Sequence, residues 1–362
     1  MNSNFCIGNR TIGRGQPVFI VAEMSANHGR SLDHAIRVLR AAKECGVDAV
    51  KIQTYTADTM TLNIARPPFV VKLDAWAGRT LYDLYQEAHT PWEWHPKLKS
   101  VADDLGIPLF SSPFDSTAVD LLEELHVPAY KVASFELTDH ALLRRIAQTG
   151  KPVIASTGMA RLDEIAEAVS VIRKSAPGVG LALLKCTSVY PADPREANLR
   201  TIAHLAETFD CVAGLSDHTM SAAVPIASVA LGACIIEKHF CLSRSEGGPD
   251  SAFSLEPDEM RALVRDVRLT EAALGRVSYE LSASEQKSRA YRRSLFVVKD
   301  VAKGEVLDSR SVRALRPADG LEPKYLSVAL GRRAACAIAR GTPLGWAHLG
   351  ESIEGGPDPT RT

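Results

Sequence analysis

The stretch AVKIQ, residues 49–53, has the pattern of a buried strand whose two faces differ in kind. Val50 and Ile52 point to one face, which suits packing against helices, whereas Lys51 and Gln53 point to the other. A lysine inside a barrel without a partner would cost several kcal/mol. We therefore expect a barrel with helices outside and, inside it, polar side chains that meet a ligand or one another.

Short apolar runs of this kind alternate with amphipathic helical patterns along the chain. Eight strands, each followed by a helix over about 250 residues, is the count for a closed parallel barrel. The alternative is an open doubly wound sheet, but no G-x-G-x-x-G motif follows the first strand. The sequence therefore predicts an α/β fold of the (β/α)8 TIM-barrel type. The expected strands are Val18–Met24, Ala49–Gln53, Pro108–Ser112, Ala129–Ser134, Val153–Thr157, Leu181–Thr187, Val212–Ser216 and Cys234–His239, and the helix-like segments include Leu32–Cys45, Thr117–Leu125, Leu142–Thr149, Leu162–Lys174, Ala222–Leu231 and Pro257–Leu274.

The alternation stops after Gly275, so residues 1–275 are expected to form the barrel domain. Residues 276–290 are largely polar and charged, which suits a linker. Residues 291–350 contain two short strand-like runs with glycine turns, which predicts a small β-rich domain. Its ~60 residues make a thin core, so it is expected to dock onto something larger. Residues 351–362 are expected to be a flexible tail.

A long insertion, Thr56–Trp94, separates the second and third expected strands and is rich in aromatic residues. Long loops after barrel strands usually carry function. A packed excursion that covers the barrel rim would have the same composition. The sequence leaves both interpretations open.

Composition restricts the class of partner. The chain has 362 residues, of which 46% are hydrophobic and 23% charged, with a formal net charge of −1. This balance gives no overall field for nucleic acid or an anionic membrane, so neither is expected as a partner, and local cations would have to hold an anionic substrate. No apolar run is long enough to span a membrane, the first ten residues lack a signal-peptide core, and the seven cysteines form no C-x-x-C pair. A reducing cytoplasm is the expected compartment.

Two lysines and a series of hydroxyl groups lie on or at the ends of the expected strands. Lys51 and Lys131 lie on strands two and four. Ammonium groups ringed by small donors suit a phosphate or a carboxylate. A single serine at a strand end more often caps the following helix, but the set as a whole favours an anion site. The hydroxyls are Ser112, Ser134, Ser156, Ser188 and Ser216.

Two histidines, His218 and His239, end strands seven and eight, which are neighbours in a closed barrel. A lone histidine is more often an ordinary hydrogen-bonding residue, but two converging imidazoles can bind a divalent metal and leave positions for water and substrate. No third histidine or cysteine suits a closed zinc site. An open, oxygen-rich Mn²⁺ or Mg²⁺ site is therefore expected.

Three carboxylates complete the candidate catalytic set. Glu23 ends strand one, Glu136 lies just beyond strand four, and Asp250 lies in the loop after strand eight. Carboxylates near lysines and a metal can orient hydroxyls or move protons. Simple charge compensation of Lys51 and Lys131 is the alternative, and the sequence does not separate the two.

These residues fall in motifs that resemble the sialic acid synthases, which condense phosphoenolpyruvate with an N-acetylated sugar to make a nine-carbon acid. The resemblance covers nearly the whole chain, and the tail resembles the antifreeze-like (SAF) domain of that family. The motifs are AEMSANH (22–28), KIQTY (51–55), SSPFD (111–115), YKVAS (130–134), STGM (156–159), GLSDHT (214–219), EKHF (237–240) and GPDSAFSL (248–255).

Within the family, the pattern is most similar to the pseudaminic acid synthases. The supporting text is WAGRTLYDLYQEAHTPWEW (76–94), FSSPFDSTAVDLLEEL (110–125), KVASFE (131–136) and LLKCTSVYPA (183–192). Lys185 and Ser188 stand where ordinary sialic acid synthases have a histidine and an asparagine. The implied sugar is 2,4-diacetamido-2,4,6-trideoxy-altrose. A legionaminic or N-acetylneuraminic acid synthase is the enzymatic alternative, and a non-catalytic sugar-binding protein is a third.

The resemblance also assigns roles by matching position. It implies that Glu23, Glu136 and Asp250 lie near the reacting centre, that Gln53 contacts the sugar, and that Arg316 reaches the sugar site of a partner subunit. A domain-swapped homodimer follows from the last point. The implied phosphoenolpyruvate ligands are Lys51, Ser112, Lys131, Ser134, Ser156, Ser188 and Ser216, and the implied metal ligands are His218 and His239.

Overall fold

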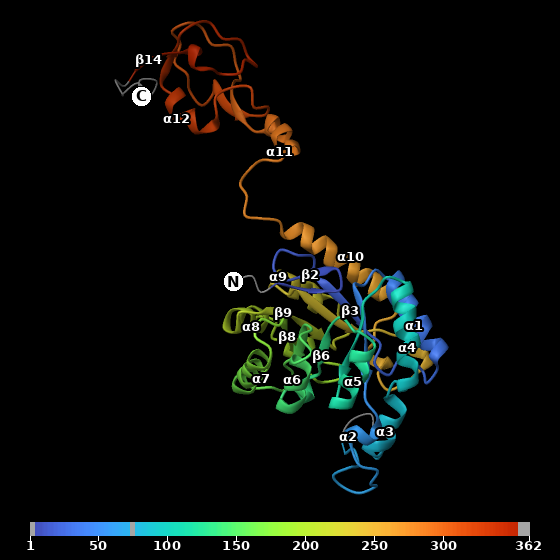
Figure 1. Cartoon of the computed structure of the whole chain (residues 1–362). Coiled ribbons are helices and arrows are strands. Elements are labelled where there is room, and N and C mark those ends of the chain that lie inside the picture. Colours follow the sequence, from blue (N-terminus) through green and yellow to red (C-terminus); the bar gives the residue numbers. More distant parts are fainter. Residues whose placement is uncertain (1–3, 73–76, 354–362) are drawn as a thin grey trace. The chain divides into compact units, whose positions relative to one another are not determined.

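The chain divides into two compact units, residues 1–275 and residues 276–362 (Figure 1). The computed structural model describes residues 4–72 and 77–353. Of the predicted flexible tail, residues 354–362 lie outside the described part. Residues 349–352 belong to a strand, so the second unit extends slightly beyond the expected end.

Eight parallel strands close into a barrel in the order β10-β3-β4-β5-β6-β7-β8-β9, which confirms the predicted TIM barrel. The strand β6 is shorter than expected, because the chain turns after it and Ser134 opens a 3-10 turn, Ser134–Glu136. The strands are β3 (Phe19–Glu23), β4 (Ala49–Thr54), β5 (Leu109–Pro113), β6 (Tyr130–Val132), β7 (Val153–Ser156), β8 (Leu181–Cys186), β9 (Val212–Asp217) and β10 (Ile235–His239).

The helices of the barrel unit begin where the sequence offers polar caps. Ser31, Asp115 and Asp139 each accept hydrogen bonds from backbone N–H groups in the first turn of their helix. The helices α4 and α8 lack such a cap, as α9 does, and α4 and α8 complete a set that the sequence predicted only in part. The helices are α1 (Leu32–Glu44), α4 (His95–Asp104), α5 (Ser116–Glu124), α6 (His140–Ala147), α7 (Leu162–Ser175), α8 (Thr201–Phe209), α9 (Ala223–Ala230) and α10 (Pro257–Leu274).

The apolar core lies between the strands and the surrounding helices, as the two-faced pattern of β4 predicts. Val50 and Ile52 are at most 2% exposed and pack in one cluster with Leu39 of α1 and Leu98 of α4. Their neighbours on the strand therefore point into the barrel. This alternation is what delivers charged side chains to the interior.

A hairpin that the sequence did not predict packs against the beginning of the barrel. It consists of β1 (Phe5–Ile7) and β2 (Arg10–Ile12), and Ile7 and Ile12 are fully buried in the core cluster that includes Phe19. Figure 1 shows this hairpin at the opposite end of the barrel from α2 and α3. The end with α2 and α3 carries the loops that follow the strands.

The described part of the long insertion, residues 56–72 and 77–94, is folded, and Trp76 lies outside the described residues. It contains α2 (Ala57–Met60), α3 (Leu81–Ala88) and a 3-10 turn, Trp92–Trp94. The indole of Trp92 donates a hydrogen bond to the carbonyl of Tyr55 at 3.1 Å, which ties the end of the insertion to the strand that precedes it. The insertion is thus anchored to the end of β4.

The second unit has its own small β-rich core. Its strands form two antiparallel pairs, β11–β12 and β13–β14, rather than two isolated runs. The predicted linker contains a short helix, α11 (Ala283–Ser288), which Ser282 and Glu285 cap reciprocally. The strands are β11 (Ser294–Val297), β12 (Val312–Leu315), β13 (Arg332–Ala334) and β14 (Leu349–Ser352), around a core that includes Leu295, Val297, Val301, Leu307, Val312 and Leu344.

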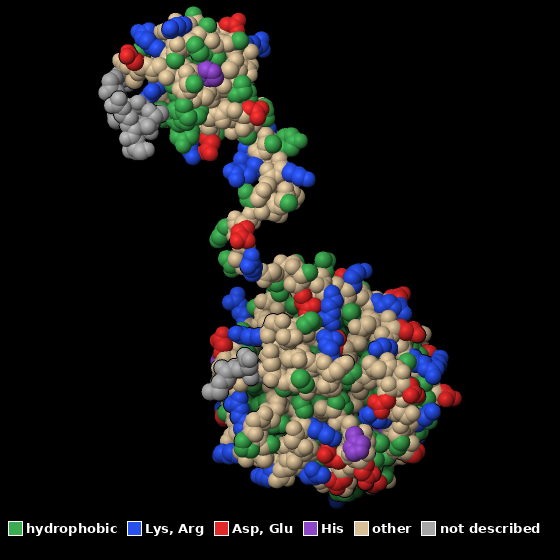
Figure 2. Space-filling view, turned by 45° about the horizontal axis from the view of Figure 1, so that its top comes forward, with side chains coloured by type: hydrophobic (Ala, Val, Ile, Leu, Met, Phe, Trp, Pro, Cys, Tyr) green, Lys and Arg blue, Asp and Glu red, His purple; other side chains and the backbone are tan. Residues whose placement is uncertain are grey.

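Charged side chains of both signs are interspersed over the face of the barrel unit in Figure 2, in keeping with a net charge of −1. In residues 4–72 and 77–353, no helix has both the length and the apolar character needed to cross a membrane.

Candidate active site

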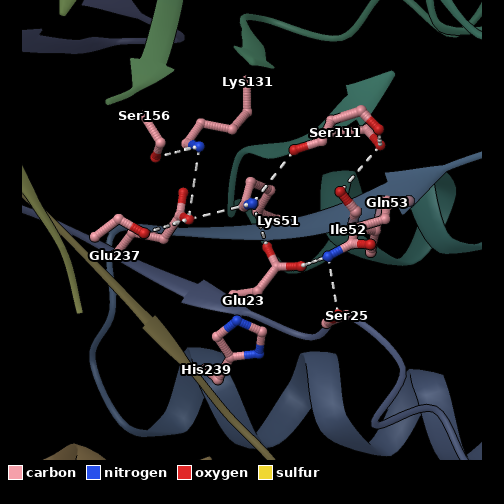
Figure 3. Close-up of polar contacts among 12 residues, drawn as sticks. Glu23, Ser25, Lys51, Ile52, Gln53, Ser111, Lys131, Ser156, Glu237 and His239 are labelled. Carbon is pink, nitrogen blue, oxygen red and sulfur yellow. Dashed lines mark hydrogen bonds and ion pairs between the residues drawn. The ribbon is translucent and has the colours of Figure 1, made fainter. Parts of the chain in front are cut away.

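Four charged side chains meet inside the barrel at the carboxyl ends of its strands (Figure 3). The Lys51 ammonium lies 2.8 Å from Glu23 Oε2 and 3.2 Å from Glu237 Oε1. Lys131 Nζ lies 3.9 Å from the same Glu237 oxygen. All four side chains are at most 6% exposed. The structure therefore brings the two predicted lysines to one point and places a carboxylate between them.

The charges of this cluster depend on one another. Burial alone would lower the pKa of Lys51, but Glu23 and Glu237 outweigh it and raise that pKa. Burial alone would raise the pKa of Glu237, but Lys131 and Lys51 hold it below its ordinary value. Burial raises the pKa of Glu23 to about 7, although Lys51 opposes the rise. Glu237 is thus the fixed anion, and Glu23 is a carboxyl able to exchange a proton near neutral pH.

Sequence reasoning did not select Glu237 as a site residue, although it shares strand parity with His239. The signal was present, because an acid at an inward position of a barrel strand needs a buried partner. The residue was overlooked because its partners, Lys51 and Lys131, lie on strands distant in the sequence.

Three of the predicted hydroxyls complete this cluster. Ser112 accepts from Lys51 at 3.3 Å, and Ser156 accepts from Lys131 at 2.7 Å. Ser216 donates to Glu237 Oε1 at 3.2 Å. Two ammonium groups and small donors around one point can bind the oxygens of a phosphate or carboxylate with several charge-assisted hydrogen bonds.

The other two predicted serines converge on a glycine. Ser134 Oγ accepts a hydrogen bond from Gly158 N at 3.2 Å. A Cβ atom added to Gly158 would lie 2.1 Å from Ser188 Oγ and 2.7 Å from Ser134 Oγ, so any larger residue would displace both hydroxyls. Gly158 lies two residues after Ser156. Together, Gly158, Ser134 and Ser188 form a second group of small donors beside the lysines. The sequence indicated Gly158 only as part of the STGM motif.

Gln53 connects the charged cluster to the loop after β3. Its amide donates to Glu23 Oε1 at 3.2 Å and to Ser25 Oγ at 2.9 Å (Figure 3). The predicted sugar-contacting side chain therefore lies beside the carboxyl whose pKa is raised.

His218 and His239 lie side by side, with ring centroids 5.3 Å apart. His218 Nδ1 lies 2.9 Å from the Thr187 carbonyl oxygen, which can accept its proton and leave Nε2 free as a ligand. His239 Nδ1 is buried with no hydrogen-bond partner and lies 4.0 Å from Asp250 Oδ2. Burial, and after it the nearby cations, lower the pKa of His239 well below its ordinary value, which favours the neutral form that binds metals.

This donor set fits an open divalent-metal site. Two imidazoles would occupy two positions, and oxygens of water or substrate would occupy the others. Within residues 4–72 and 77–353, no group of three His, Cys, Asp or Glu side chains is arranged to hold a metal. The metal itself stays a prediction.

A thiol lies next to the histidine pair. Cys186 Sγ lies 4.0 Å from His218 Nδ1 and 3.6 Å from Ser188 Oγ. Burial alone would raise the pKa of the Cys186 thiol, but His218 and neighbouring hydroxyls lower it to about 7. Burial in turn would lower the pKa of His218, and Cys186 raises it. The two side chains therefore compete for a proton.

The remaining predicted carboxylates line the same end of the barrel. Asp250 Oδ2 accepts from Ala26 N at 3.3 Å, and burial raises the pKa of Asp250. Glu136 Oε2 is buried without a hydrogen-bond partner, and burial raises the pKa of Glu136 to about 7. A carboxyl with such a pKa can take up and release a proton at neutral pH.

Two aromatic side chains that sequence reasoning missed flank the histidines. The Tyr190 ring lies 4.3 Å from the His218 ring, and the Phe253 ring lies 5.0 Å from the His239 ring. Tyr190 belongs to the LLKCTSVYPA segment and Phe253 to GPDSAFSL, so both were quoted as motif letters without a role. They give the histidine pair an aromatic wall.

Arg316 lies in the second unit, directly after β12, and is exposed. Its expected contact is with the barrel of a partner subunit, so its role stays a prediction.

Comparison with known proteins gives this geometry its family. Residues 38–279 match the NeuB family, and residues 292–350 match the SAF domain. A pseudaminic acid synthase from Helicobacter pylori is 44% identical over 330 residues, which are 91% of this chain and 97% of the relative. An N,N'-diacetyllegionaminic acid synthase from Legionella pneumophila is 36% identical over 357 residues, 96% of this chain and 99% of the relative.

A solved structure agrees with these relatives. It is that of an N-acetylneuraminic acid (sialic acid) synthetase from Leptospira borgpetersenii in complex with citrate. It superposes with a TM-score of 0.71 at 32% identity and covers 80% of this chain and 95% of its own. The predicted resemblance and the predicted C-terminal SAF domain are confirmed. The chain belongs to the NeuB family.

Proposed function

We propose that this chain condenses phosphoenolpyruvate with 2,4-diacetamido-2,4,6-trideoxy-altrose and water, giving pseudaminic acid and phosphate. The observation that carries the proposal is the 44% identity to the pseudaminic acid synthase from Helicobacter pylori over 91% of this chain. The legionaminic acid synthase from Legionella pneumophila covers as much of the chain at only 36% identity. The buried lysine pair supports the use of an anionic substrate.

Phosphoenolpyruvate carries a phosphate and a carboxylate on the same carbon, C2, and the site offers two sets of donors. In the proposed complex, Lys51 and Lys131 with their serine partners hold one of these groups. Ser134, Ser188 and the backbone N–H of Gly158 hold the other. Glu237 keeps both lysines in place and Lys51 charged. The enol carbon is thereby oriented toward the histidine pair.

The histidine pair would hold Mn²⁺ or Mg²⁺, which when bound acts as a Lewis acid toward the sugar aldehyde. The remaining steps take place between the substrates and the side chains around them. C3 of phosphoenolpyruvate attacks the aldehyde carbon, whose oxygen takes up a proton and becomes a hydroxyl. Water then adds at C2 of phosphoenolpyruvate and gives up its protons as the C2–O bond breaks, which leaves a ketone and releases phosphate. Glu23, with a pKa of about 7, is the group suited to take the proton of the added water.

Phosphate release from a panel of sugars tests the substrate. The purified protein is incubated with phosphoenolpyruvate, Mn²⁺ and, in separate reactions, the altrose derivative, the legionaminic acid precursor and N-acetylmannosamine. We expect phosphate release with the altrose derivative at least about tenfold faster than with either other sugar, because pocket contacts to one altered group discriminate by about this factor or more. Turnover with N-acetylmannosamine alone would contradict the proposal.

We also propose that the active unit is a homodimer in which Arg316 of one chain completes the barrel site of the other. A mixture of Arg316→Ala and Lys51→Ala proteins, after unfolding and joint refolding, is then expected to recover about a quarter of wild-type activity, because random pairing gives half hybrids with one intact site each. Each variant alone serves as the control. Subunit exchange verified by mass spectrometry without recovered activity would count against the arrangement.

A cytoplasmic location is part of the proposal. All seven cysteines are free, and five of them are buried in the barrel unit. Free thiols are typical of a reducing compartment.

A further inference from the structure

The inserted helix α3 presents two tyrosines with different surroundings. Tyr82 donates a hydrogen bond to Asp58 of α2 at 3.2 Å, in an exposed position. Tyr85 instead packs edge-on against the Tyr55 ring, with centroids 5.8 Å apart, and His89 lies 6.5 Å from the same ring. No residue of α3 is fully buried, so burial in a core does not explain the composition of the helix.

Tyr55 connects this helix to the active site. It directly follows β4, two residues after Gln53, and is only 4% exposed. Phe114, which follows β5, packs edge-on against it at 5.0 Å. Burial, and after it the charge of Asp250, raises the pKa of the Tyr55 phenol, so its hydroxyl lies within electrostatic range of the site.

Glu136 lies in the turn after β6, and β6 is the neighbour in the barrel of β5, the strand that Phe114 follows. Its Oε2 atom is buried without a hydrogen-bond partner, which is costly unless a donor arrives with a ligand. Burial, and after it the charge of Glu136, raises the pKa of Tyr85, so this phenol lies within electrostatic range of the carboxylate. A buried acceptor without a donor and a phenol at the edge of an aromatic cluster thus lie on the same side of the barrel mouth, above β4, β5 and β6.

We propose that Tyr85, supported by Tyr55 and Phe114, is the specificity-determining residue for the 4-acetamido group of the sugar, with Glu136 as the acceptor for its N–H. An acetamido group needs an acceptor for its N–H, a donor for its carbonyl and an apolar surface for its methyl. Glu136, the Tyr85 hydroxyl and the aromatic rings supply these three features. A hydroxyl substituent would leave the donor and the rings unused.

The position of the cluster assigns it to C4 rather than C2. Tyr190 and Phe253 contact the histidine pair, where the aldehyde is expected, and so flank the carbon next to it. The Tyr55–Tyr85 cluster comes from β4 and α3, separate from these rings. It suits a substituent further along the sugar chain. This inference rests on the proposed function, because it presupposes an acetamido sugar.

The test compares Tyr85→Phe with the matched variant Tyr82→Phe on the same helix. Each variant is assayed with the diacetamido sugar and with its analogue that has a hydroxyl at C4. For Tyr85→Phe we expect the KM for the diacetamido sugar to rise about tenfold, as loss of one neutral hydrogen bond allows. The KM for phosphoenolpyruvate and kcat should stay within about twofold, and Tyr82→Phe should match the wild type in all values.

Equal sugar preference in Tyr85→Phe, Tyr82→Phe and the wild type would overturn the inference. So would an equal rise of KM for both sugars, since that outcome indicates a structural role. Thermal melting of both variants checks that the phenylalanine preserves packing. If the wild type uses another acetamido sugar instead, the proposed function fails, and the same ratio with that sugar and its hydroxyl analogue still decides the role of Tyr85.

Discussion

Lys131→Met is expected to lower kcat/KM for phosphoenolpyruvate by about a thousandfold or more. Methionine preserves the length of the side chain but removes an ammonium that is 2% exposed, donates to Ser156 at 2.7 Å and lies 3.9 Å from Glu237. Truncation of one partner of a buried, hydrogen-bonded charge pair in a binding site typically costs about 2–5 kcal/mol of binding free energy, because the other charge is left unpaired. Initial rates of phosphate release at varied phosphoenolpyruvate measure the effect.

A matched control is available on the outer surface of the same barrel. Lys151 pairs with Glu123 at 2.6 Å, and their side chains are 26% and 32% exposed. Lys151→Met should leave kcat/KM unchanged within about twofold, since exposed ion pairs contribute only about 0–1 kcal/mol. If Lys131→Met folds, as judged by circular dichroism, and binds phosphoenolpyruvate like the wild type, the proposed anion site is wrong.

His218→Ala is expected to abolish the response of activity to Mn²⁺, with a fall in rate of about a thousandfold. The imidazole is one of two ring ligands available to the metal, and alanine leaves His239 alone, 4.0 Å from Asp250. A single imidazole cannot hold a divalent ion at micromolar concentrations in competition with water. The measurements are activity after chelator treatment and Mn²⁺ addition, and direct Mn²⁺ binding by electron paramagnetic resonance.

His140→Ala provides the control for this experiment. His140 has a side chain that is 41% exposed and lies 3.8 Å from Glu167 at the outer surface. The His140→Ala protein should bind Mn²⁺, and its activity should respond to Mn²⁺ like that of the wild type. A His218→Ala protein that still binds Mn²⁺ with wild-type affinity would remove His218 from the ligand set.

Much of the fold followed from the alternation of strand patterns. The two-faced sequence around Lys51 predicted which side chains enter the barrel, and the order of the strands confirms it. The helices α4 and α8 and the hairpin β1–β2 were not predicted, and the hairpin has only three residues per strand. Short elements take their stability from packing, which local sequence does not display.

The site was predictable to a similar extent. Strand parity selected Lys51, and strand position added His218 and His239, because inward polar residues are rare without a purpose. Neither parity nor position revealed Glu237 as the shared partner of both lysines. That pairing depends on three strands meeting around one axis, and a linear pattern carries no information about which inward residues face one another.

The sequence by itself therefore determined the barrel, the inward direction of its charged residues and the family. Only the tertiary structure decided which charged side chains neutralise each other. It also showed that Gly158 must lack a side chain beside Ser134 and Ser188, and that Tyr85 of the insertion lies against Tyr55. The physical reason is range. Periodicity and capping act over a few residues along the chain, whereas ion pairs, steric limits and ring contacts depend on distances across the closed barrel.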